Sequence, residues 1–209
     1  MSLDAIINEA LRERVGLRKL YPYSLSNITH CTAYADVGAQ AVAIAQHVTR
    51  YQTRLIIAIY LHEVGHIIAG AEGIDHDPGG RTHNRFFACL VAVMYRRLDL
   101  LDHLKTYDFA DTEAGQKSDD NRQFPADSEL ARRYAYIIRR SAQLAPLPLS
   151  IEQIARKLYR EDVCAAWCAP AKPDQAAQRI IARDAFTWLL GFAVGIITTA
   201  AAAAVVALR

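Results

Sequence analysis

The sequence predicts an α+β fold, in which helices pack against a β-hairpin or small sheet and are followed by further helices and a C-terminal transmembrane helix. Three observations predict it. Apolar residues recur at helical spacing along most of the chain, whereas residues 28–48 hold two apolar segments around a turn. The chain has 209 residues, of which 52% are hydrophobic, enough for one compact domain but not for two large ones. No charged residue occurs between positions 186 and 208.

The N-terminal part alternates between helical and extended patterns. Residues 3–19 carry apolar side chains at helical spacing and predict one amphipathic helix. Residues 21–27, YPYSLSN, contain proline, serine and asparagine and indicate a loop. Residues 28–34 and 40–48 flank a turn that contains aspartate and glycine, so we expect them to form a β-hairpin.

The middle of the chain predicts two helices and a long polar segment. Residues 53–70 are strongly apolar and have the length of a helix. A glycine-rich stretch with a Pro-Gly-Gly cluster then indicates a loop, after which Thr82 can cap a helix that runs to about Leu104. Residues 108–127 are polar and acid-rich, which predicts a linker or surface loop. Two more helices, at about 128–143 and 150–167, are expected in a helical extension that spans residues 128–169.

The C-terminal segment has the length and composition of a membrane span. At about 1.5 Å per residue, residues 186–208 can cross a hydrocarbon core about 30 Å thick. The N-terminus has no secretory signal, so we expect residues 184–209 to be a single-pass C-terminal anchor with the catalytic domain in the cytoplasm. Gly191 and Gly195 form a GxxxG pattern that favours a homodimer. The alternative is a buried helix in a soluble oligomer.

Charge gives no indication of a nucleic-acid partner. The formal net charge is +2, and no block of lysine and arginine stands out. We therefore expect no specific nucleic-acid binding. Three pairs of adjacent arginines are interpreted as solvated helix faces: Arg96-Arg97, Arg132-Arg133 and Arg139-Arg140.

The motif that carries chemistry lies inside the apolar helix at 53–70. His62 and His66 are four residues apart, so they share one helical face and can both bind one Zn²⁺ ion. Glu63 is placed to act as general base on a water that zinc activates. Because the surrounding residues are almost all apolar, three polar side chains there would be costly unless something binds them. The sequence therefore predicts a zinc site.

A catalytic zinc usually has three protein ligands and one open position. The residues that could supply the third ligand are Glu72, Asp75, His76, Asp77, His83 and Glu129. Glu72 falls where an extended HExxHxxGxxH motif has its last histidine, but residue 69 is alanine instead of the glycine that this motif needs. His83 follows the glycine-rich loop at the start of the returning helix, which could direct its side chain at the metal.

The order of these features resembles that of the SprT-like metallopeptidases: a helix, a hairpin, an HExxH helix, and a loop that ends in His-x-x-x-aromatic. The resemblance rests on two segments, His62-Glu63-Val64-Gly65-His66 and His83-Asn84-Arg85-Phe86-Phe87, and covers roughly residues 1–104. It implies a zincin domain, placed here at residues 1–107. It also implies that the three histidines bind zinc, that Glu63 is the catalytic base and that the substrate is a protein or peptide.

The sequence departs from this family at two points. Many members have glycine after the third histidine, where this chain has Asn84. Many also carry a C-terminal zinc ribbon, for which this chain has only Cys164 and Cys168. The DNA contact that the ribbon implies is therefore not expected here.

Two other functions compete with this interpretation. A gluzincin-like or membrane-bound zinc protease would use Glu129 as third ligand, although residues 55–70 look too short to span a membrane. A non-catalytic, zinc-stabilised, membrane-anchored interaction module would use residues 128–167 as its surface.

In the peptidase, we expect residues 40–48 to be an edge strand that pairs with the substrate backbone. Tyr60 and Tyr95 are expected to be core aromatics instead of oxyanion-stabilising groups.

Overall fold

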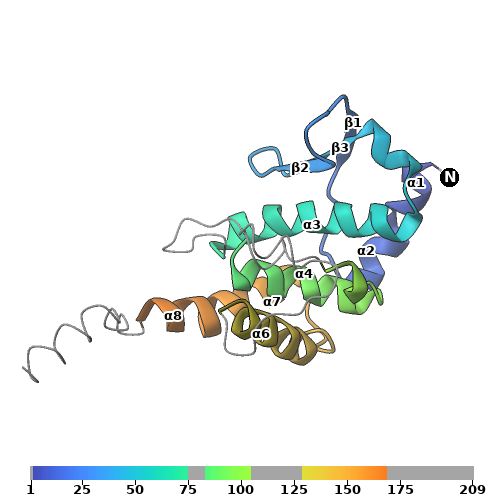
Figure 1. Cartoon of the computed structure of the whole chain (residues 1–209). Helices are drawn as coiled ribbons and strands as arrows, with labels where there is room; N and C mark the ends of the chain where they lie inside the picture. The colour runs from blue at the N-terminus through green and yellow to red at the C-terminus, as the bar shows by residue number, and fades with distance from the viewer. Residues whose placement is uncertain (1, 75–82, 105–128, 169–209) are drawn as a thin grey trace, which may run out of the picture. The chain divides into compact units, whose positions relative to one another are not determined.

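The computed structural model describes residues 2–74, 83–104 and 129–168, and all structural statements below concern these residues. The described residues up to position 167 belong to one compact unit. A small sheet lies on one side of the long helix α3 (Thr53–Glu72), and helices α4 (Arg85–Arg97), α6 (Glu129–Leu144) and α7 (Ile151–Leu158) lie on the other (Figure 1). The predicted α+β class, with helices and a small sheet, is confirmed.

The N-terminal helix predicted for residues 3–19 is divided in two, so that prediction was wrong. Helix α1 (Leu3–Ile6) ends where Ile7 is extended, at φ −98° and ψ 91°. Asn8 then caps α2 (Glu9–Val15), because its side-chain oxygen accepts a hydrogen bond from the Leu11 amide at 3.1 Å. The apolar periodicity continues across the break, since both helices bury their apolar residues in the same core.

The sheet contains the predicted hairpin and one strand that was not predicted. Strands β2 (Ala33–Asp36) and β3 (Ala41–Ala45) pair antiparallel, which confirms the hairpin. The segment predicted to be a loop contains β1 (Tyr23–Ser26), which pairs parallel with β3. Its two central residues are exposed, so no alternation of apolar residues marks it as a strand. The strand order is β1-β3-β2, so β3 is central and buried.

Helix α3 follows a short 3₁₀ helix, η1 (Gln46–Arg50), and ends at Gly73, whose φ of +73° is favourable only for glycine. With 20 residues, α3 is long and apolar enough to cross a membrane, and it is the one such helix among the described residues. The sequence-based statement that this segment is too short to span was therefore wrong. However, 56% of its most apolar window is buried inside the chain, as expected for the core helix of a globular protein.

Helix α4 forms the centre of the helical layer. Every residue from Phe86 to Tyr95 is buried, because α3 covers one side and α6 the other. A short 3₁₀ helix, η2 (Leu101–His103), follows it. Helix α7 begins after its N-cap Ser150, which forms a capping box with Gln153. It continues into a π-helical turn, η4 (Tyr159–Val163), and α8 (Cys164–Cys168).

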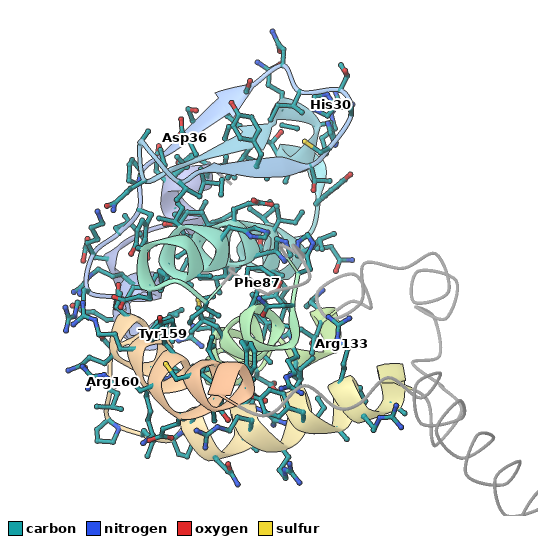
Figure 2. The ribbon with its side chains drawn as sticks, turned by 90° about the vertical axis from the view of Figure 1, so that its left-hand side faces the viewer. His30, Asp36, Phe87, Arg133, Tyr159 and Arg160 are labelled. Carbon is teal, nitrogen blue, oxygen red and sulfur yellow. The ribbon has the colours of Figure 1, made fainter. Side chains whose placement is uncertain are left out.

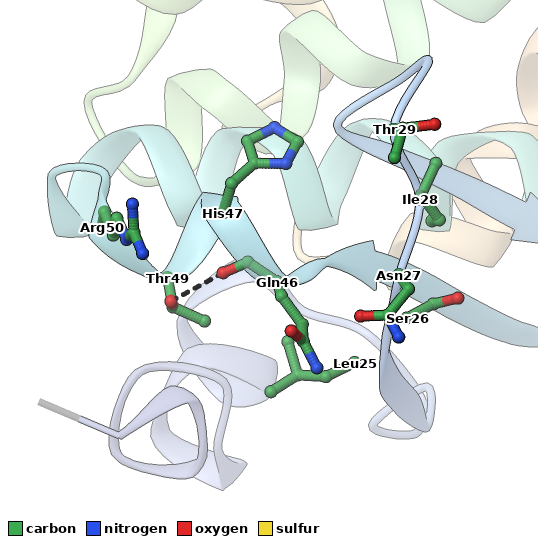
Figure 3. A pocket seen from close by; sticks show the side chains of 9 residues that line it. All are labelled: Leu25, Ser26, Asn27, Ile28, Thr29, Gln46, His47, Thr49 and Arg50. Carbon is green, nitrogen blue, oxygen red and sulfur yellow. Dashed lines mark hydrogen bonds between the residues drawn. The ribbon is translucent and has the colours of Figure 1, made fainter.

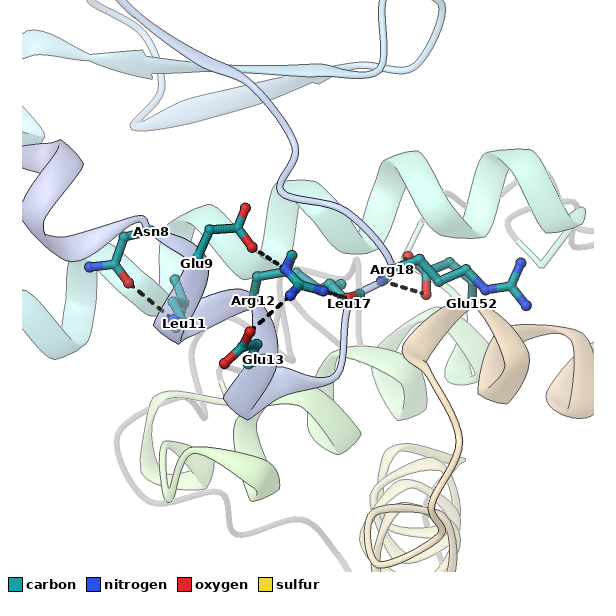
Figure 4. A network of polar contacts seen from close by, with 8 residues as sticks. All are labelled: Asn8, Glu9, Leu11, Arg12, Glu13, Leu17, Arg18 and Glu152. Atoms are coloured by element: carbon teal, nitrogen blue, oxygen red, sulfur yellow. Dashed lines mark hydrogen bonds and ion pairs between the residues drawn. The ribbon is translucent and has the colours of Figure 1, made fainter.

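Helix α7 is joined to the N-terminal segment by a buried carboxylate. The two oxygens of Glu152 accept hydrogen bonds from the backbone N–H of Arg18, at 3.1 and 3.2 Å (Figure 4). The amide of Ile151 donates to the Gly16 carbonyl at 2.9 Å. Residues of the predicted extension therefore contribute to the same core as the HExxH helix.

The arginine pairs are not simply solvated faces, so this prediction was wrong for at least one member of each pair. Arg97 donates to the backbone carbonyls of Val15, Ala145, Leu147 and Leu149. Arg96 bonds the Ser141 hydroxyl and the Ile138 carbonyl. Arg140 pairs with Glu161 and Asp162, and Arg133 is buried.

The linker predicted for residues 108–127 and the C-terminal anchor predicted for residues 184–209, with Gly191 and Gly195, lie outside the described residues. The same holds for residues 75–82, which include Thr82, the predicted cap of the second helix. Within the described part, α4 begins one residue after Asn84, which is its N-cap.

Candidate metal centre

Two histidines of the site are presented by α3. His62 and His66 are one turn apart, about 40° around the helix axis, so their rings are neighbours. The ring centroids are 4.9 Å apart. His62 and Glu63 are buried, with exposed fractions of 7% and 9%. Glu63 lies about 100° from His62 and about 60° from His66 around the axis, next to the side of the helix that carries the two histidines.

The third histidine, His83, lies in the turn just before α4. The Nε2 atom of His83 lies 3.2 Å from that of His62 and 3.1 Å from that of His66. The ligand atoms of these three residues all lie within 4.8 Å of one another. The structure thus brings together His62, His66 and His83, the histidines that the sequence analysis proposed as ligands, and they could hold a metal ion.

The spacing and chemistry of these nitrogens fit a metal. Tetrahedral zinc with Zn–N bonds of about 2.05 Å places neighbouring nitrogens roughly 3.3 Å apart. The two contacts of His83 are close to that value. Hydrogen bonding alone does not account for both contacts, because a ring nitrogen carries either one proton or one in-plane lone pair. A cation between the rings can accept a lone pair from all three.

Phe87 of α4 contacts all three imidazole rings. Figure 2 labels this residue between α3 and α4. Its ring is stacked on His66, with centroids 4.2 Å apart and an interplanar angle of 17°. It meets His62 and His83 edge-on, at 5.2 Å in each case. Because Phe87 is fully buried, it restricts the orientation of each ring and explains the aromatic residue four positions after His83.

Gly65 allows α4 to approach α3 closely at this point. A Cβ atom at position 65 would lie 3.0 Å from Val91 Cγ2, 3.3 Å from Phe87 Cε2 and 3.4 Å from Met94 Cε. These distances are shorter than ordinary van der Waals contacts between carbons. The glycine inside the motif therefore serves the packing of Phe87 against the histidines.

Asn84 fixes the backbone next to the third histidine. Its side-chain oxygen accepts hydrogen bonds from the Phe86 and Phe87 amides, both at 2.9 Å. Its side-chain nitrogen donates to the Ile74 carbonyl at 2.7 Å. Asn84 thus caps α4 and joins it to the end of α3, a task that glycine at this position could not perform.

The surroundings of His66 keep its imidazole uncharged. Burial, followed by the neighbouring His62 and His83, lowers the pKa of His66 to about 3. His66 is therefore neutral at physiological pH, and a neutral imidazole is the form that binds a metal.

The other candidates for third ligand do not join the cluster within the described residues. Glu72 is engaged elsewhere, because both its oxygens accept from Arg156 Nε of α7, at 2.9 and 3.0 Å. Asp75, His76 and Asp77 lie outside the described residues, and so does the side chain of Glu129, although Glu129 begins α6.

The two tyrosines near the motif are core residues, as expected. The Tyr60 hydroxyl donates to the Tyr21 carbonyl at 2.8 Å, and the Tyr95 hydroxyl donates to the Ala58 carbonyl at 2.9 Å. Both side chains are buried. Burial also raises the pKa of Tyr60 well above its usual range.

The strand proposed to bind substrate is not at an edge, so that prediction was wrong. Strand β3 is paired on both sides, whereas β2 pairs with β3 alone within the described part and packs against α3. The end of β3 instead borders a cavity of about 670 Å³, lined by the segments 25–29 and 46–50 (Figure 3). The cavity contains His47 but none of the three clustered histidines.

Comparison with known proteins gives no relative: no family model, no curated protein and no solved structure matches this chain.

Proposed function

We propose that the protein is a zinc-dependent metallopeptidase of the SprT-like type. The observation that carries this proposal is the convergence of three imidazole side chains close to the buried Glu63, with His83 Nε2 at distances from the other two nitrogens that suit tetrahedral zinc. A purely structural zinc site has four protein ligands and no use for a base. Within the described residues the cluster contains three ligand residues, which favours a catalytic site with an open position.

The residues of the site have distinct roles in this proposal. His62, His66 and His83 hold the metal, and Phe87 orients their rings. Zinc would supply Lewis acidity, which lowers the pKa of a coordinated water to about 7 and polarises the carbonyl of the scissile bond. Glu63 accepts a proton from the attacking water and returns it to the nitrogen of the leaving amine.

The substrate is proposed to be an extended polypeptide that pairs with β2. This strand has one paired side within the described residues and packs against α3, the helix that carries the motif. Pairing through backbone N–H and C=O groups depends little on side chains. Such an enzyme is expected to act on unfolded segments of many sequences, because a folded substrate does not present a free strand.

We also propose that the chain is tethered to a membrane, with the catalytic domain in the cytoplasm. This rests on residues 186–208, which are uncharged and long enough to span the bilayer. Flotation of the full chain with liposomes tests this proposal. If the full chain is refolded in the presence of liposomes and still remains in the soluble fraction, the membrane tether is contradicted.

The activity is tested by replacing Glu63 with glutamine, which keeps the size of the side chain and removes the base. We expect Glu63→Gln to retain zinc and to hydrolyse an unfolded, dye-labelled protein at least about 100-fold more slowly. The matched control is Glu13→Gln, an exposed glutamate of α2, which should behave as wild type. Equal hydrolysis by Glu63→Gln and wild type would rule out Glu63 as the base.

A further inference from the structure

The backbone of His83 is held by a residue far away in the sequence. Arg133 of α6 donates from Nη2 to the His83 carbonyl at 2.8 Å, across 50 positions of the chain (Figure 2 labels Arg133). Arg133 is buried, with an exposed fraction of 7%. A buried guanidinium is costly unless it forms good hydrogen bonds, and a charged donor forms stronger ones than a neutral donor. The hydrogen bond from Arg133 to the His83 carbonyl is therefore a candidate for a specific role at the site.

Helix α6 is docked on the same turn of α4 that follows His83. Tyr136, three residues after Arg133, meets the ring of Phe86 edge-on, with centroids 5.9 Å apart. The guanidinium of Arg85 lies over both rings, at 4.8 Å from Phe86 and 5.3 Å from Tyr136. These contacts keep α6 in place against the start of α4. The guanidinium of Arg133 is thus presented to His83 from a fixed element.

His83 needs such support more than the other two histidines do. His62 and His66 lie in the interior of α3, where the helical hydrogen bonds fix the backbone. His83 lies in a turn before α4, outside any helix. Asn84 anchors the chain on one side of it, and the bond from Arg133 fixes its own carbonyl. A metal site tolerates errors of only about 0.2 Å in ligand distance, so a small displacement of this turn matters.

We propose that Arg133 is a positioning residue for the third metal ligand. By binding the His83 carbonyl, it holds the imidazole at the spacing required by a metal, and it makes α6 part of the metal centre. This inference rests on the proposed metal site but not on the peptidase reaction. Residues that support metal ligands in this way typically change metal affinity by about 10- to 100-fold when they are replaced.

The test measures zinc affinity of the full chain by competition with a chromogenic chelator. We expect Arg133→Gln to weaken zinc binding by about 10- to 100-fold. Arg133→Lys, which keeps a charged donor without the planar guanidinium, should recover part of this loss and remain about threefold or more below wild type. The matched control is Arg139→Gln, an exposed arginine on the same helix, which should bind zinc as wild type does.

A spectroscopic readout separates positioning from general stability. With Co²⁺ in place of zinc, the visible absorption bands report ligand geometry, and they should change in Arg133→Gln but not in Arg139→Gln. Wild-type affinity and an unchanged Co²⁺ spectrum in Arg133→Gln would overturn the inference, even if the metal-free variant unfolds at a lower temperature. If Arg133→Gln does not fold, wild-type affinity in Arg133→Lys overturns it. A wild-type chain that binds no zinc would instead refute the metal site itself.

Discussion

Single residues around the histidines determine how well the metal centre is built. His83 supplies the third nitrogen, Phe87 restricts the rings, and Asn84 and Arg133 fix the turn from two sides. Gly65 leaves little space for a larger residue, because an added Cβ would lie 3.0 Å from Val91 Cγ2. The site therefore depends on a close approach of α3 and α4 as much as on its ligands.

The replacement Gly65→Ala tests this close approach. Alanine improves helix propensity by up to about 1 kcal/mol, whereas overpacking a core costs about 1–3 kcal/mol. The steric cost should dominate, because the new Cβ would lie 3.0 Å from the fully buried Val91 side chain. We expect the free energy of unfolding, measured in urea, to fall by about 1–2 kcal/mol, and zinc affinity to fall as Phe87 shifts.

The control for Gly65→Ala is Gly38→Ala in the hairpin turn. There the nearest atom to a new Cβ is Asp36 Oδ1 at 3.5 Å, an ordinary contact. Stability should change by less than about 0.5 kcal/mol. A Gly65→Ala protein that is more stable than wild type and binds zinc equally well would show that the helices are not closely packed at this point.

Sequence patterns pointed to the three clustered histidines but not to the residues that support them. His62 and His66 could be predicted because helical spacing alone places them on one face. His83 was one of six candidates for the third ligand, and the resemblance of residues 83–87 to a family motif singled it out. Arg133 could not be predicted, since a pair of arginines on an amphipathic helix looks like a solvated face. Its role depends on where α6 docks, and that is set by packing of residues such as Phe86 and Tyr136.

Among the helices and strands, α4 and its last turn connect the parts of the molecule. Arg97 donates to carbonyls at the end of α2 and in the connection between α6 and α7. These carbonyls lie at the end of a helix or in a connection, where helices and strands do not supply all of their hydrogen bonds, and Arg97 is a further donor to each. Burial lowers the pKa of Arg97, yet the guanidinium stays charged at any physiological pH.

Replacement of Arg97 tests whether its hydrogen bonds hold α4 against the end of α2 and the connection between α6 and α7. We expect Arg97→Ala to lower the free energy of unfolding by about 2–3 kcal/mol, because four partly buried carbonyls lose a charged donor together. Arg97→Lys should restore only part of the stability, since one ammonium cannot reach all of these carbonyls. Arg14→Ala, an exposed arginine of α2, is the control, and thermal and urea unfolding provide the measurement. A loss below about 0.5 kcal/mol in Arg97→Ala would contradict this role.

The strands show where the spacing of apolar residues in the sequence does not predict secondary structure. The hairpin could be predicted because the turn residues and both strands are adjacent in the sequence. Strand β1 could not, since its parallel pairing with β3 joins segments that are separated in the sequence by β2, and it leaves Leu25 49% exposed. The break at Asn8 was hidden for a different reason: a local cap interrupts the helix while apolar residues continue toward the same core.

At the scale of the whole molecule, the helices after residue 128 belong to the same compact unit as the motif. Helix α6 covers α4, and α7 contacts both α3 and α4. Ile151, Ile154 and Leu158 are fully buried in that core. The metal centre thus depends on a part of the chain that a family resemblance over the first half does not include.

A chain that ends at residue 107 tests this dependence. Without α6 and α7, the buried side chains of α4 would meet water, and Arg133 would be missing from His83. We expect this shortened chain to be unfolded by circular dichroism and to lack tight zinc binding, whereas a chain that ends at residue 168 should fold. A folded, zinc-binding chain of residues 1–107 would show that the later helices are a separate extension.

The central claim, a metal site made by His62, His66 and His83, is tested most directly by the zinc content of the purified full chain, measured by mass spectrometry of the metal. The account predicts about one zinc per chain in wild type, and loss of most of it in His83→Ala but not in His47→Ala, whose histidine lies outside the cluster. Full retention of zinc in His83→Ala would contradict the account.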